Sequence, residues 1–410
     1  MSEVIIILFI YLFAKIVLDT LQMNTIKNVI IDNKSLQLLD ISKDDNDKSR
    51  QYNVEKLNLS MIKNIFYIAW IYIILLGGLF KYINITLFNY DIDSSYVDLI
   101  TILITYIIVH ISMIPFSFYS NFIIETKYGF NTSTKMLFFK DNLISLVLTL
   151  PIISLLSLVF FKLVTYQSYW WLLMSLALFA IIIISMFIYP TYISPIFNKF
   201  KKLQNENIKN EIKDLSERTN FSIENIYVMD SSKRSKHPNA YFTGFSSNRR
   251  IVFYDTLIDL LSPREIKAVL AHEIGHYKHK HIIKSLMMSA CVLFASMFFI
   301  SQLINNANYL EILNLPINSS SQLIALFFTY QIISFFTDPF FSSLSRKNEY
   351  EADIFASRQV EKEFLISSLT KLYKSNLSFL IPNKFYAIFY FTHPTVLERI
   401  NNLRSNNERS

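Results

Sequence analysis

The sequence predicts a mainly α-helical, polytopic membrane protein with seven transmembrane helices, on the evidence of its composition, its apolar segments and the distribution of its basic residues. Hydrophobic residues make up 52% of the 410 residues, charged residues make up 17%, and the mean hydropathy is +0.32. Because an average soluble domain is about 25% charged, this chain carries more apolar surface than a soluble core can bury.

The apolar segments are long enough to cross a membrane, since a helical span needs about 20 mostly apolar residues. The first segment lacks the basic start and small-residue cleavage site of a signal peptide, so we expect it to remain as a span. The predicted spans are Val4–Leu21, Ile65–Tyr82, Val97–Phe116, Leu143–Phe161, Tyr169–Tyr189, Leu286–Leu303 and Leu323–Phe341.

Basic residues are unevenly distributed between the loops. Loops 83–96 and 304–322 contain no Lys or Arg, whereas the alternate loops 22–60, 117–142 and 190–285 and the tail 342–410 are rich in them. By the positive-inside rule, loop 190–285 and the tail lie together on the cytoplasmic side, and the amino terminus lies outside or in the lumen. The net charge of +7 fits this bias, and without a basic stripe interleaved with aromatics we expect no nucleic-acid partner.

A helix start precedes the most informative motif. Ser262, Pro263 and Glu265 form a capping pattern, which predicts a helix over Arg264–His281. On this helix His272 and His276 are four residues apart and project from one face, so both imidazoles can reach one ion. The only Cys, Cys291, excludes a cysteine-ligated site, so any metal must use His and carboxylate ligands.

The residue after the first histidine is a candidate proton acceptor. In the H-E-x-x-H pattern, Glu273 is placed to take a proton from a zinc-bound water as that water attacks a peptide carbonyl. The pattern has only three fixed positions, so a chance match is a real alternative. Catalytic zinc usually has three protein ligands, and Glu349 is the best candidate for the third, with Asp353 one turn later as a hydrogen-bond partner of a ligand histidine. An ordinary charged amphipathic helix is the alternative interpretation of this segment.

Together these segments resemble the type I CAAX prenyl endopeptidases, a family of seven-span membrane zinc proteases. Further similar stretches follow in the family's order along most of the chain: Tyr128–Asn131, Ser194–Phe200, Ser232–Ser235, Asn239–Phe245, Asp255–Leu257, His393–Pro394 and Leu397–Arg399. The resemblance implies a cage of transmembrane helices around a large intramembrane chamber, with a zincin-like metalloprotease region and a short β-hairpin at its cytoplasmic end.

The resemblance also implies roles for individual residues. His272, His276 and Glu349 would hold one Zn²⁺, Glu273 would be the general base, and Asp353 would support a ligand. His393 and Arg399 would line the site and donate hydrogen bonds to the oxyanion. Asn239, Ala240 and Tyr241 would form an edge strand that pairs with an extended substrate. His279 and His281 are expected at a solvated helix end.

Four parts of the chain follow from these assignments. Residues 1–189 hold the first five membrane helices, 190–285 the catalytic loop with strands at Ile226–Asp230 and Arg250–Tyr254, 286–341 the last two spans, and 342–410 the third ligand with the site-lining His and Arg.

The function implied by the resemblance is removal of the last three residues of prenylated CaaX proteins or peptides, in contact with membrane lipid. A membrane quality-control zinc protease of the HtpX type is the alternative enzyme, and a transporter or scaffold with an incidental motif is the alternative from another class. The chain ends in Glu408-Arg409-Ser410, with no retrieval signal. We therefore expect the endoplasmic reticulum membrane in a eukaryote or the inner membrane in a bacterium.

Overall fold

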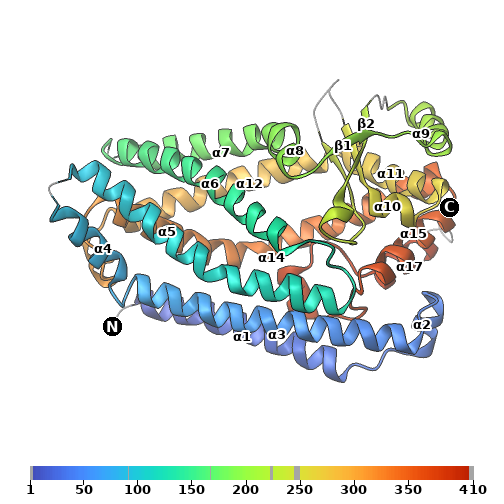
Figure 1. Ribbon diagram of the computed structural model, residues 1–410, viewed down its shortest axis with the longest axis horizontal. Helices are drawn as coiled ribbons and strands as arrows, with labels where there is room; N and C mark the ends of the chain where they lie inside the picture. Colours follow the sequence, from blue (N-terminus) through green and yellow to red (C-terminus); the bar gives the residue numbers. More distant parts are fainter. Residues whose placement is uncertain (1–2, 91, 167, 222–224, 244–249, 406–410) are drawn as a thin grey trace.

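The computed structural model describes the chain except residues 1–2, 91, 167, 222–224, 244–249 and 406–410. The long helices run along the long axis of an elongated molecule, and a small sheet lies at one end with the carboxyl-terminal helices (Figure 1). The Ser and Asn residues at 246–248 predict a turn before the expected strand Arg250–Tyr254. This turn, the end of the Asn239–Phe245 stretch and the tail Glu408–Ser410 lie outside the described residues.

The membrane part is built from long apolar helices. Among the described residues, six helical segments are long and apolar enough to cross a membrane. They are α3 (Lys43–Ile74), α5 (Ser94–Tyr119) continued by η1 (Ser120–Glu125), α6 (Lys135–Val164), α7 (Trp170–Ile188) continued by η2 (Tyr189–Ile193) and α8 (Ser194–Phe197), α12 (His281–Ile304) and α14 (Ser319–Gln359). The first predicted span forms α1 (Glu3–Asn28), which packs along α3 but is not among these six, so the count of seven stays a prediction.

The boundaries predicted for the second span are wrong. Ile65–Tyr82 is not one helix, because α3 ends at Ile74 and a separate helix, α4 (Leu79–Phe88), follows. Gly77 and Gly78 separate the two, and Gly78 has a φ of 74°, which glycine adopts without steric cost. At its other end α3 begins at Lys43, where the Ser42 side chain accepts a hydrogen bond from the Asp45 N–H. Most of the expected loop 22–60 is therefore helical, since α1 and α2 (Asn33–Leu38) also lie partly or wholly within it.

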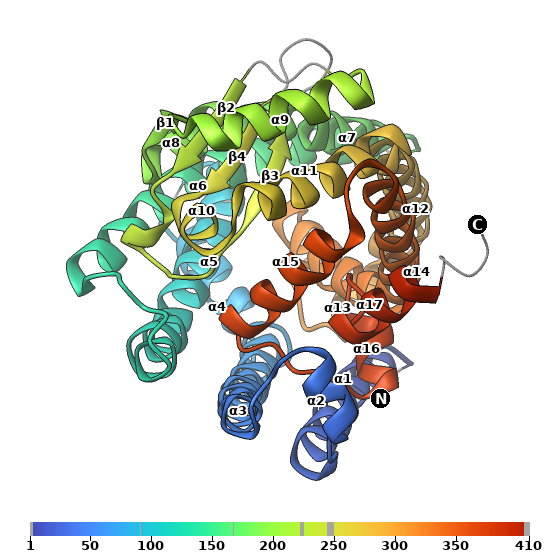
Figure 2. The same ribbon diagram turned by 90° about the vertical axis from the view of Figure 1, so that its right-hand side faces the viewer.

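The membrane helices pack around an apolar core and leave apolar side chains on the outside. Phe80, Phe160 and Trp170 are fully buried in this core. Ile65, Leu143 and other large apolar side chains are exposed, which suits a surface that faces lipid. Seen along the long axis, the helices are arranged around the periphery of the molecule (Figure 2). The enclosed chamber implied by the family stays a prediction.

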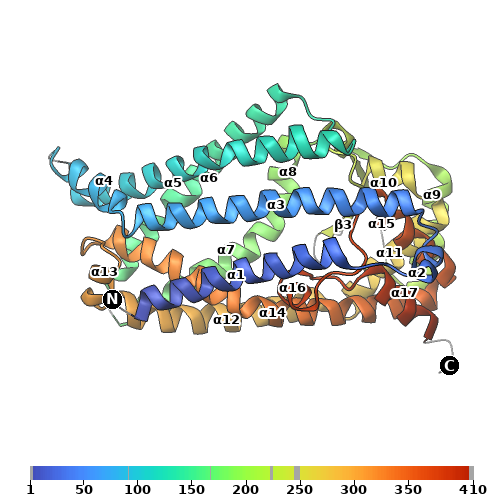
Figure 3. The same ribbon diagram turned by 90° about the horizontal axis from the view of Figure 1, so that it is seen from below.

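The predicted sidedness of the loops agrees with the arrangement of the chain. Helices α4 and α13 (Ala307–Ile312), from the two loops without Lys or Arg, lie at one end, and the sheet and carboxyl-terminal helices lie at the other (Figure 3). The latter end holds α2 (Asn33–Leu38), α9 (Glu206–Thr219), α10 (Asp255–Leu260), α11 (Pro263–Lys278), α15 (Lys362–Ser375) and α17 (Val396–Ser405). Loop 190–285 and the tail are therefore on one side, as the charge distribution predicts.

A mixed four-stranded sheet covers this end. Its order is β1 (Phe200–Lys202), β2 (Asn225–Met229), β4 (Arg250–Tyr254), β3 (Ala240–Thr243), with η3 (Ser231–Lys233) after β2. The two predicted strands are present as β2 and β4, but they pair in parallel with each other. The antiparallel pairs are β1 with β2 and β3 with β4. As a result, β3 is the terminal strand of the described sheet, with one side not paired to another strand.

Helix α14 carries the chain from the membrane to the sheet end without interruption. It is 41 residues long and continues through Pro339 and the predicted division at residue 341. It packs closely on α11, where a Cβ atom added to Gly275 would lie 3.0 Å from the Cα and 3.1 Å from the carbonyl oxygen of Ala352. The helix α16 (Lys384–Tyr390), which follows α15 in the chain, also packs on α14. The division of the chain into four parts stays a prediction.

Replacing this glycine is expected to separate the two helices. Gly275→Ala should lower stability by about 1–3 kcal/mol, as overpacking of a core does, because the opposing atoms are backbone and cannot rotate away. The measurement is the thermal unfolding midpoint of the full chain in detergent. Lys278→Ala, at an exposed position of the same helix, is the control; an unchanged midpoint in Gly275→Ala would contradict the close packing.

Candidate metal centre

The helix that carries the H-E-x-x-H motif begins as the sequence predicts. Ser262 Oγ accepts a hydrogen bond from the Glu265 N–H, and the Glu265 carboxylate accepts one from the Ser262 N–H at 2.7 Å. The same carboxylate accepts hydrogen bonds from Ser367 and Lys371 of α15. Although burial opposes this, hydrogen bonds from Lys371, Ser367 and Ser262 hold the pKa of Glu265 below its usual range. This cap therefore fixes the start of α11 and ties it to α15.

The end of this helix differs from the prediction. The helix expected over Arg264–His281 stops at Lys278, because Lys280 adopts a left-handed conformation with a φ of 57°. A second helix, α12, starts at His281. The chain therefore changes direction between the motif and His281.

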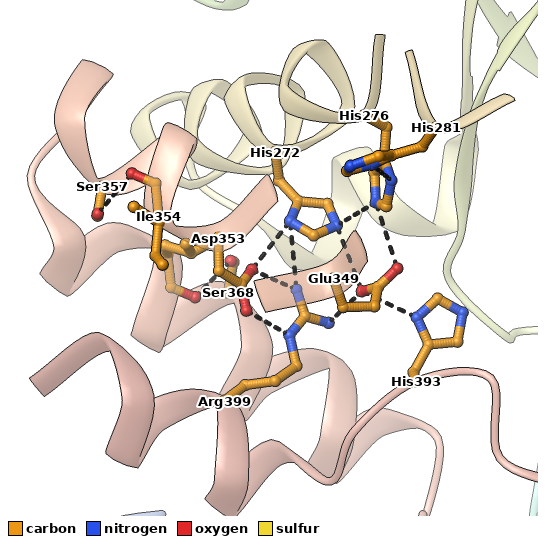
Figure 4. Close-up of polar contacts among 11 residues, drawn as sticks. His272, His276, His281, Glu349, Asp353, Ile354, Ser357, Ser368, His393 and Arg399 are labelled. Atoms are coloured by element: carbon orange, nitrogen blue, oxygen red, sulfur yellow. Dashed lines mark hydrogen bonds and ion pairs between the residues drawn. The ribbon is translucent and has the colours of Figure 1, made fainter. Parts of the chain in front are cut away.

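The three predicted metal ligands converge. His272, His276 and Glu349 each offer a ligand atom, and these atoms lie within 4.8 Å of one another (Figure 4). His272 Nε2 lies 3.1 Å from His276 Nε2, and His276 Nε2 lies 3.2 Å from Glu349 Oε1. Two histidines from α11 and one carboxylate from α14 thus meet at one point, although they are separated by more than 70 residues in the chain.

Asp353 and Arg399 fix the orientation of the first histidine. Asp353 Oδ1 lies 2.9 Å from His272 Nδ1, and Arg399 binds the same carboxylate with two hydrogen bonds, of 2.8 and 2.6 Å. The Nδ1–H of His272 donates to Asp353, so its Nε2 faces the other ligands. Despite burial, hydrogen bonds to Asp353 and Glu349 raise the pKa of His272 to about 9. A metal ion would take the place of that proton on Nε2.

Glu349 is buried with charged neighbours on several sides. Its Oε2 lies 2.9 Å from His393 Nδ1 and 3.3 Å from Arg399 Nη1. Even so, Oε2 accepts no well-aligned hydrogen bond from the described residues. A buried carboxylate oxygen left in this way, beside two imidazoles, fits a metal ligand. Two histidines and one glutamate are also the donor set of a catalytic zinc with one open position.

The site opens into a cavity of about 420 Å³. Its wall brings together residues from the motif helix, α14, the carboxyl-terminal segment and the start of β3: His272, Glu273, Glu349, His393, Arg399, Asn239 and Ala240. Of the predicted site residues, Asp353 lies behind His272, and Tyr241 is outside the cavity wall, with its ring edge-on to Tyr254. The alternation of side chains along β3 explains why Tyr241 points elsewhere than Ala240.

His281 is a site residue that sequence reasoning missed. The expected solvated helix end holds for His279, which is exposed, but is wrong for His281, whose side chain is 4% exposed and 2.9 Å from His276. Five residues separate His276 from His281, which is not a spacing that brings two side chains together on one continuous helix. The contact depends on the change of direction at Lys280, for which the sequence offers no signal.

Comparison with known proteins assigns the chain to a protein family. A helical membrane body in which an H-E-x-x-H helix and a glutamate of a second helix form a His-His-Glu centre defines an integral membrane metalloprotease. The family model for peptidase family M48 matches residues 202–407, and the model for the CAAX prenyl protease N-terminal region, five membrane helices, matches residues 34–199. The chain belongs to peptidase family M48, which implies a metal at its active site.

Individual relatives agree with this assignment. The chain is 38% identical over 300 residues to a CAAX prenyl protease 1 homolog of Dictyostelium discoideum, covering 72% of this chain and 70% of the relative. It is 33% identical over 308 residues to CAAX prenyl protease 1 of Saccharomyces cerevisiae, covering 70% and 67%. The crystal structure of S. mikatae Ste24p matches 98% of this chain and 99% of its own, with a TM-score of 0.89 and 28% identity.

Removing the charge of the helix cap is expected to weaken the support of α11. Glu265→Gln should lower stability by about 1–3 kcal/mol, the usual effect of losing a cap and charged hydrogen bonds. Because folding depresses the Glu265 pKa, its contribution is present above the unfolded value of about 4.3 and is lost as the pH falls below it. Thermal unfolding of both proteins between pH 7 and pH 3 tests this: the difference should shrink on acidification, and a difference that grows would contradict it.

Proposed function

We propose that this protein is an integral membrane zinc endopeptidase that removes the C-terminal tripeptide of prenylated CaaX proteins or peptides. The observation that carries the proposal is the convergence of His272, His276 and Glu349 at the edge of an open cavity that Glu273 also lines. The names of the relatives, CAAX prenyl protease 1 and its homologs, support the substrate class.

One zinc ion is proposed to bind His272 Nε2, His276 Nε2 and Glu349. When bound, zinc acts as a Lewis acid that polarises the scissile carbonyl and lowers the pKa of a water in the cavity. The protein residues around the ligands keep these donors in place: Asp353 orients His272, and Arg399 holds Asp353.

Glu273 is proposed as the general base. It follows a ligand histidine on α11, lines the cavity and is half-buried, so its carboxylate is in the same space as an incoming peptide. It accepts a proton from the attacking water as the water's oxygen bonds to the carbonyl carbon. It then delivers that proton to the amine of the departing tripeptide as the peptide bond breaks.

His393 and Arg399 are proposed to stabilise the negative oxygen that forms during the attack. The side chain of His393 lines the cavity and is 64% exposed, so it is accessible to a substrate oxygen there. Arg399 is buried, and its Nε and Nη2 already bind Asp353, which leaves Nη1 toward Glu349. We therefore propose His393 as the more direct donor and Arg399 as the cation that also holds the two carboxylates in place.

The substrate is proposed to bind as an added strand beside β3. This strand is terminal in the described sheet, and Asn239 and Ala240 lie at its start, on the cavity wall. An extended peptide there forms main-chain hydrogen bonds that do not depend on its side chains. Tyr241 would contribute through its backbone, because its side chain is outside the cavity wall.

The catalytic end is proposed to lie on the cytoplasmic side. The basic loops and the metal ligands are at the same end of the molecule, opposite α4 and α13 (Figure 3). We propose the endoplasmic reticulum membrane if the cell is eukaryotic and the inner membrane if it is bacterial.

The alternatives from the sequence are less well supported. Membership of a peptidase family decides against a transporter or scaffold with an incidental motif. A quality-control protease of the HtpX type shares the zinc helix, but the match to the five-helix CAAX prenyl protease N-terminal region favours the CAAX type.

The role of Glu273 can be separated from metal binding. Glu273→Gln should keep about one zinc per chain and lower peptidase activity by 10²-fold or more, since general-base catalysis contributes about 10²–10⁴-fold. Metal content by elemental analysis and cleavage of a farnesylated peptide are the two measurements. Activity close to that of the unchanged protein would overturn the assignment.

The substrate class is tested with paired peptides. The purified chain should cleave a farnesylated CaaX peptide faster than the same peptide without the lipid, and a zinc chelator should abolish both reactions. The measurement is the initial rate for each peptide in detergent or lipid vesicles. Equal rates for the two peptides would remove the prenyl-specific part of the proposal and leave a membrane zinc peptidase.

A further inference from the structure

His276 has a second polar contact on the side away from the proposed metal. Its Nε2 faces His272 Nε2 at 3.1 Å and Glu349 Oε1 at 3.2 Å, while its Nδ1 lies 2.9 Å from Nδ1 of His281 (Figure 4). The two rings are nearly perpendicular, with an angle of 75° between their planes. His276 therefore joins the ligand cluster to a histidine at the start of α12.

His281 in turn contacts a carboxylate of α14. Its Nε2 lies 3.1 Å from Glu351 Oε2, and its side chain is almost completely buried. Glu351 is at the rim of the protein, with Lys284 and Lys347 about 4 Å from its carboxylate oxygens. A continuous series of hydrogen-bond contacts thus runs from His276 through His281 to Glu351.

The metal would fix the direction of every hydrogen bond in this series. A histidine that binds metal through Nε2 is neutral and carries its proton on Nδ1. The Nδ1–H of His276 must then donate to Nδ1 of His281, which has to be unprotonated there. His281 consequently carries its own proton on Nε2 and donates it to Glu351. Each nitrogen and the carboxylate oxygen has a compatible partner in this one arrangement.

We infer that His281 and Glu351 are positioning residues for the metal centre, holding His276 in the ring orientation and tautomer in which its Nε2 is free to bind the ion. The inference rests on the proposed function, because it requires a metal at His272, His276 and Glu349. The negative charge of Glu351, acting through the hydrogen bond to His281, also makes His276 Nε2 more basic and so a stronger metal ligand, as carboxylates hydrogen-bonded to ligand histidines do.

The geometry of α14 explains why His276 needs an intermediate histidine. Glu349 and Asp353 are four residues apart and lie on one face, so Asp353 reaches His272 directly. Glu351, two residues from each, projects about 200° away around the helix. It reaches His276 only through His281. One helix therefore supplies a ligand and the carboxylate behind each of the two ligand histidines.

A second metal site is the competing interpretation of the same residues. His279, His281 and Glu351 also offer ligand atoms within 4.8 Å of one another. A metal on His281 Nε2 would place the proton of His281 on Nδ1, which would then face the Nδ1–H of His276 at 2.9 Å. The two sites cannot both be filled by neutral histidines in this arrangement. Lys284 and Lys347, near Glu351, oppose a further cation as well.

The test measures zinc binding by the full chain in detergent, by chelator competition and elemental analysis. The unchanged protein should bind one zinc. His281→Phe, which keeps a ring without hydrogen bonds, should bind it 10–100-fold more weakly, the usual loss for a residue behind a metal ligand. His281→Gln should recover much of the affinity, because its carboxamide oxygen accepts from His276 and its NH₂ donates to Glu351.

Two further variants keep the inference falsifiable if His281→Phe fails to fold. Glu351→Leu, at a partly exposed position, should also weaken zinc binding, by about tenfold. His279→Ala is the matched control, since His279 stacks on His281 and its Nδ1 is 4.0 Å from Glu351 Oε2, too far for a hydrogen bond in the series. It should leave the affinity unchanged.

The outcomes separate the inference from the proposed function. Unchanged zinc affinity in both His281→Phe and Glu351→Leu would overturn the inference but leave the proposed function standing. Equal weakening in His281→Phe and His281→Gln would also overturn the inference, because it would indicate that His281 acts only through packing. A second zinc that is lost in His279→Ala would establish the competing site instead. An unchanged protein that binds no zinc would overturn the proposed metal centre itself.

Discussion

The close crossing of α11 and α14 is the contact on which the centre depends. Gly275 lies between the two histidines of the motif and faces Ala352, which lies between Glu349 and Asp353. Because no Cβ separates the helices there, their backbones approach closely enough for side chains from both to share one ion. A larger residue at the crossing would move His272 and His276 away from Glu349.

Buried charge sets the next constraint. Glu349 and Asp353 are almost completely excluded from solvent, which is unfavourable for carboxylates unless they are paired and hydrogen-bonded. Arg399 pairs with both, and its planar guanidinium matches the Asp353 carboxylate with two hydrogen bonds. α17 is thereby held against α14, and the segment that carries His393 is brought over Glu349. The ion pairs that offset the cost of burying these two carboxylates therefore also hold the segments that form the wall of the cavity.

The membrane and the metal centre share one structural element. At 1.5 Å per residue, the 41 residues of α14 extend for about 60 Å, roughly twice the thickness of a hydrocarbon core. This helix is therefore long enough to cross the apolar layer and continue beyond it, and its carboxyl-terminal part, with Glu349, packs with α11 and α15. A lipid-modified tail that stays in the membrane can present its adjoining peptide at this level, which is the physical basis for joining a membrane body to a peptidase centre.

The sequence by itself determined the local features: apolar spans, the basic bias of alternate loops, the helix cap at Ser262 and the pairing of His272 with His276. The spans, the cap and the histidine pair each depend on residues close together in the chain, and the basic bias requires only counting Lys and Arg in each loop. The spacing alone did not distinguish the Glu349 segment from an ordinary charged helix; its assignment came from the resemblance of several blocks taken together. Only the tertiary structure decided the break after Ile74, the parallel pairing of β2 with β4, and the burial of His281 behind His276. These depend on contacts between distant segments and on single backbone conformations, at Gly78 and Lys280, that short-range patterns do not specify.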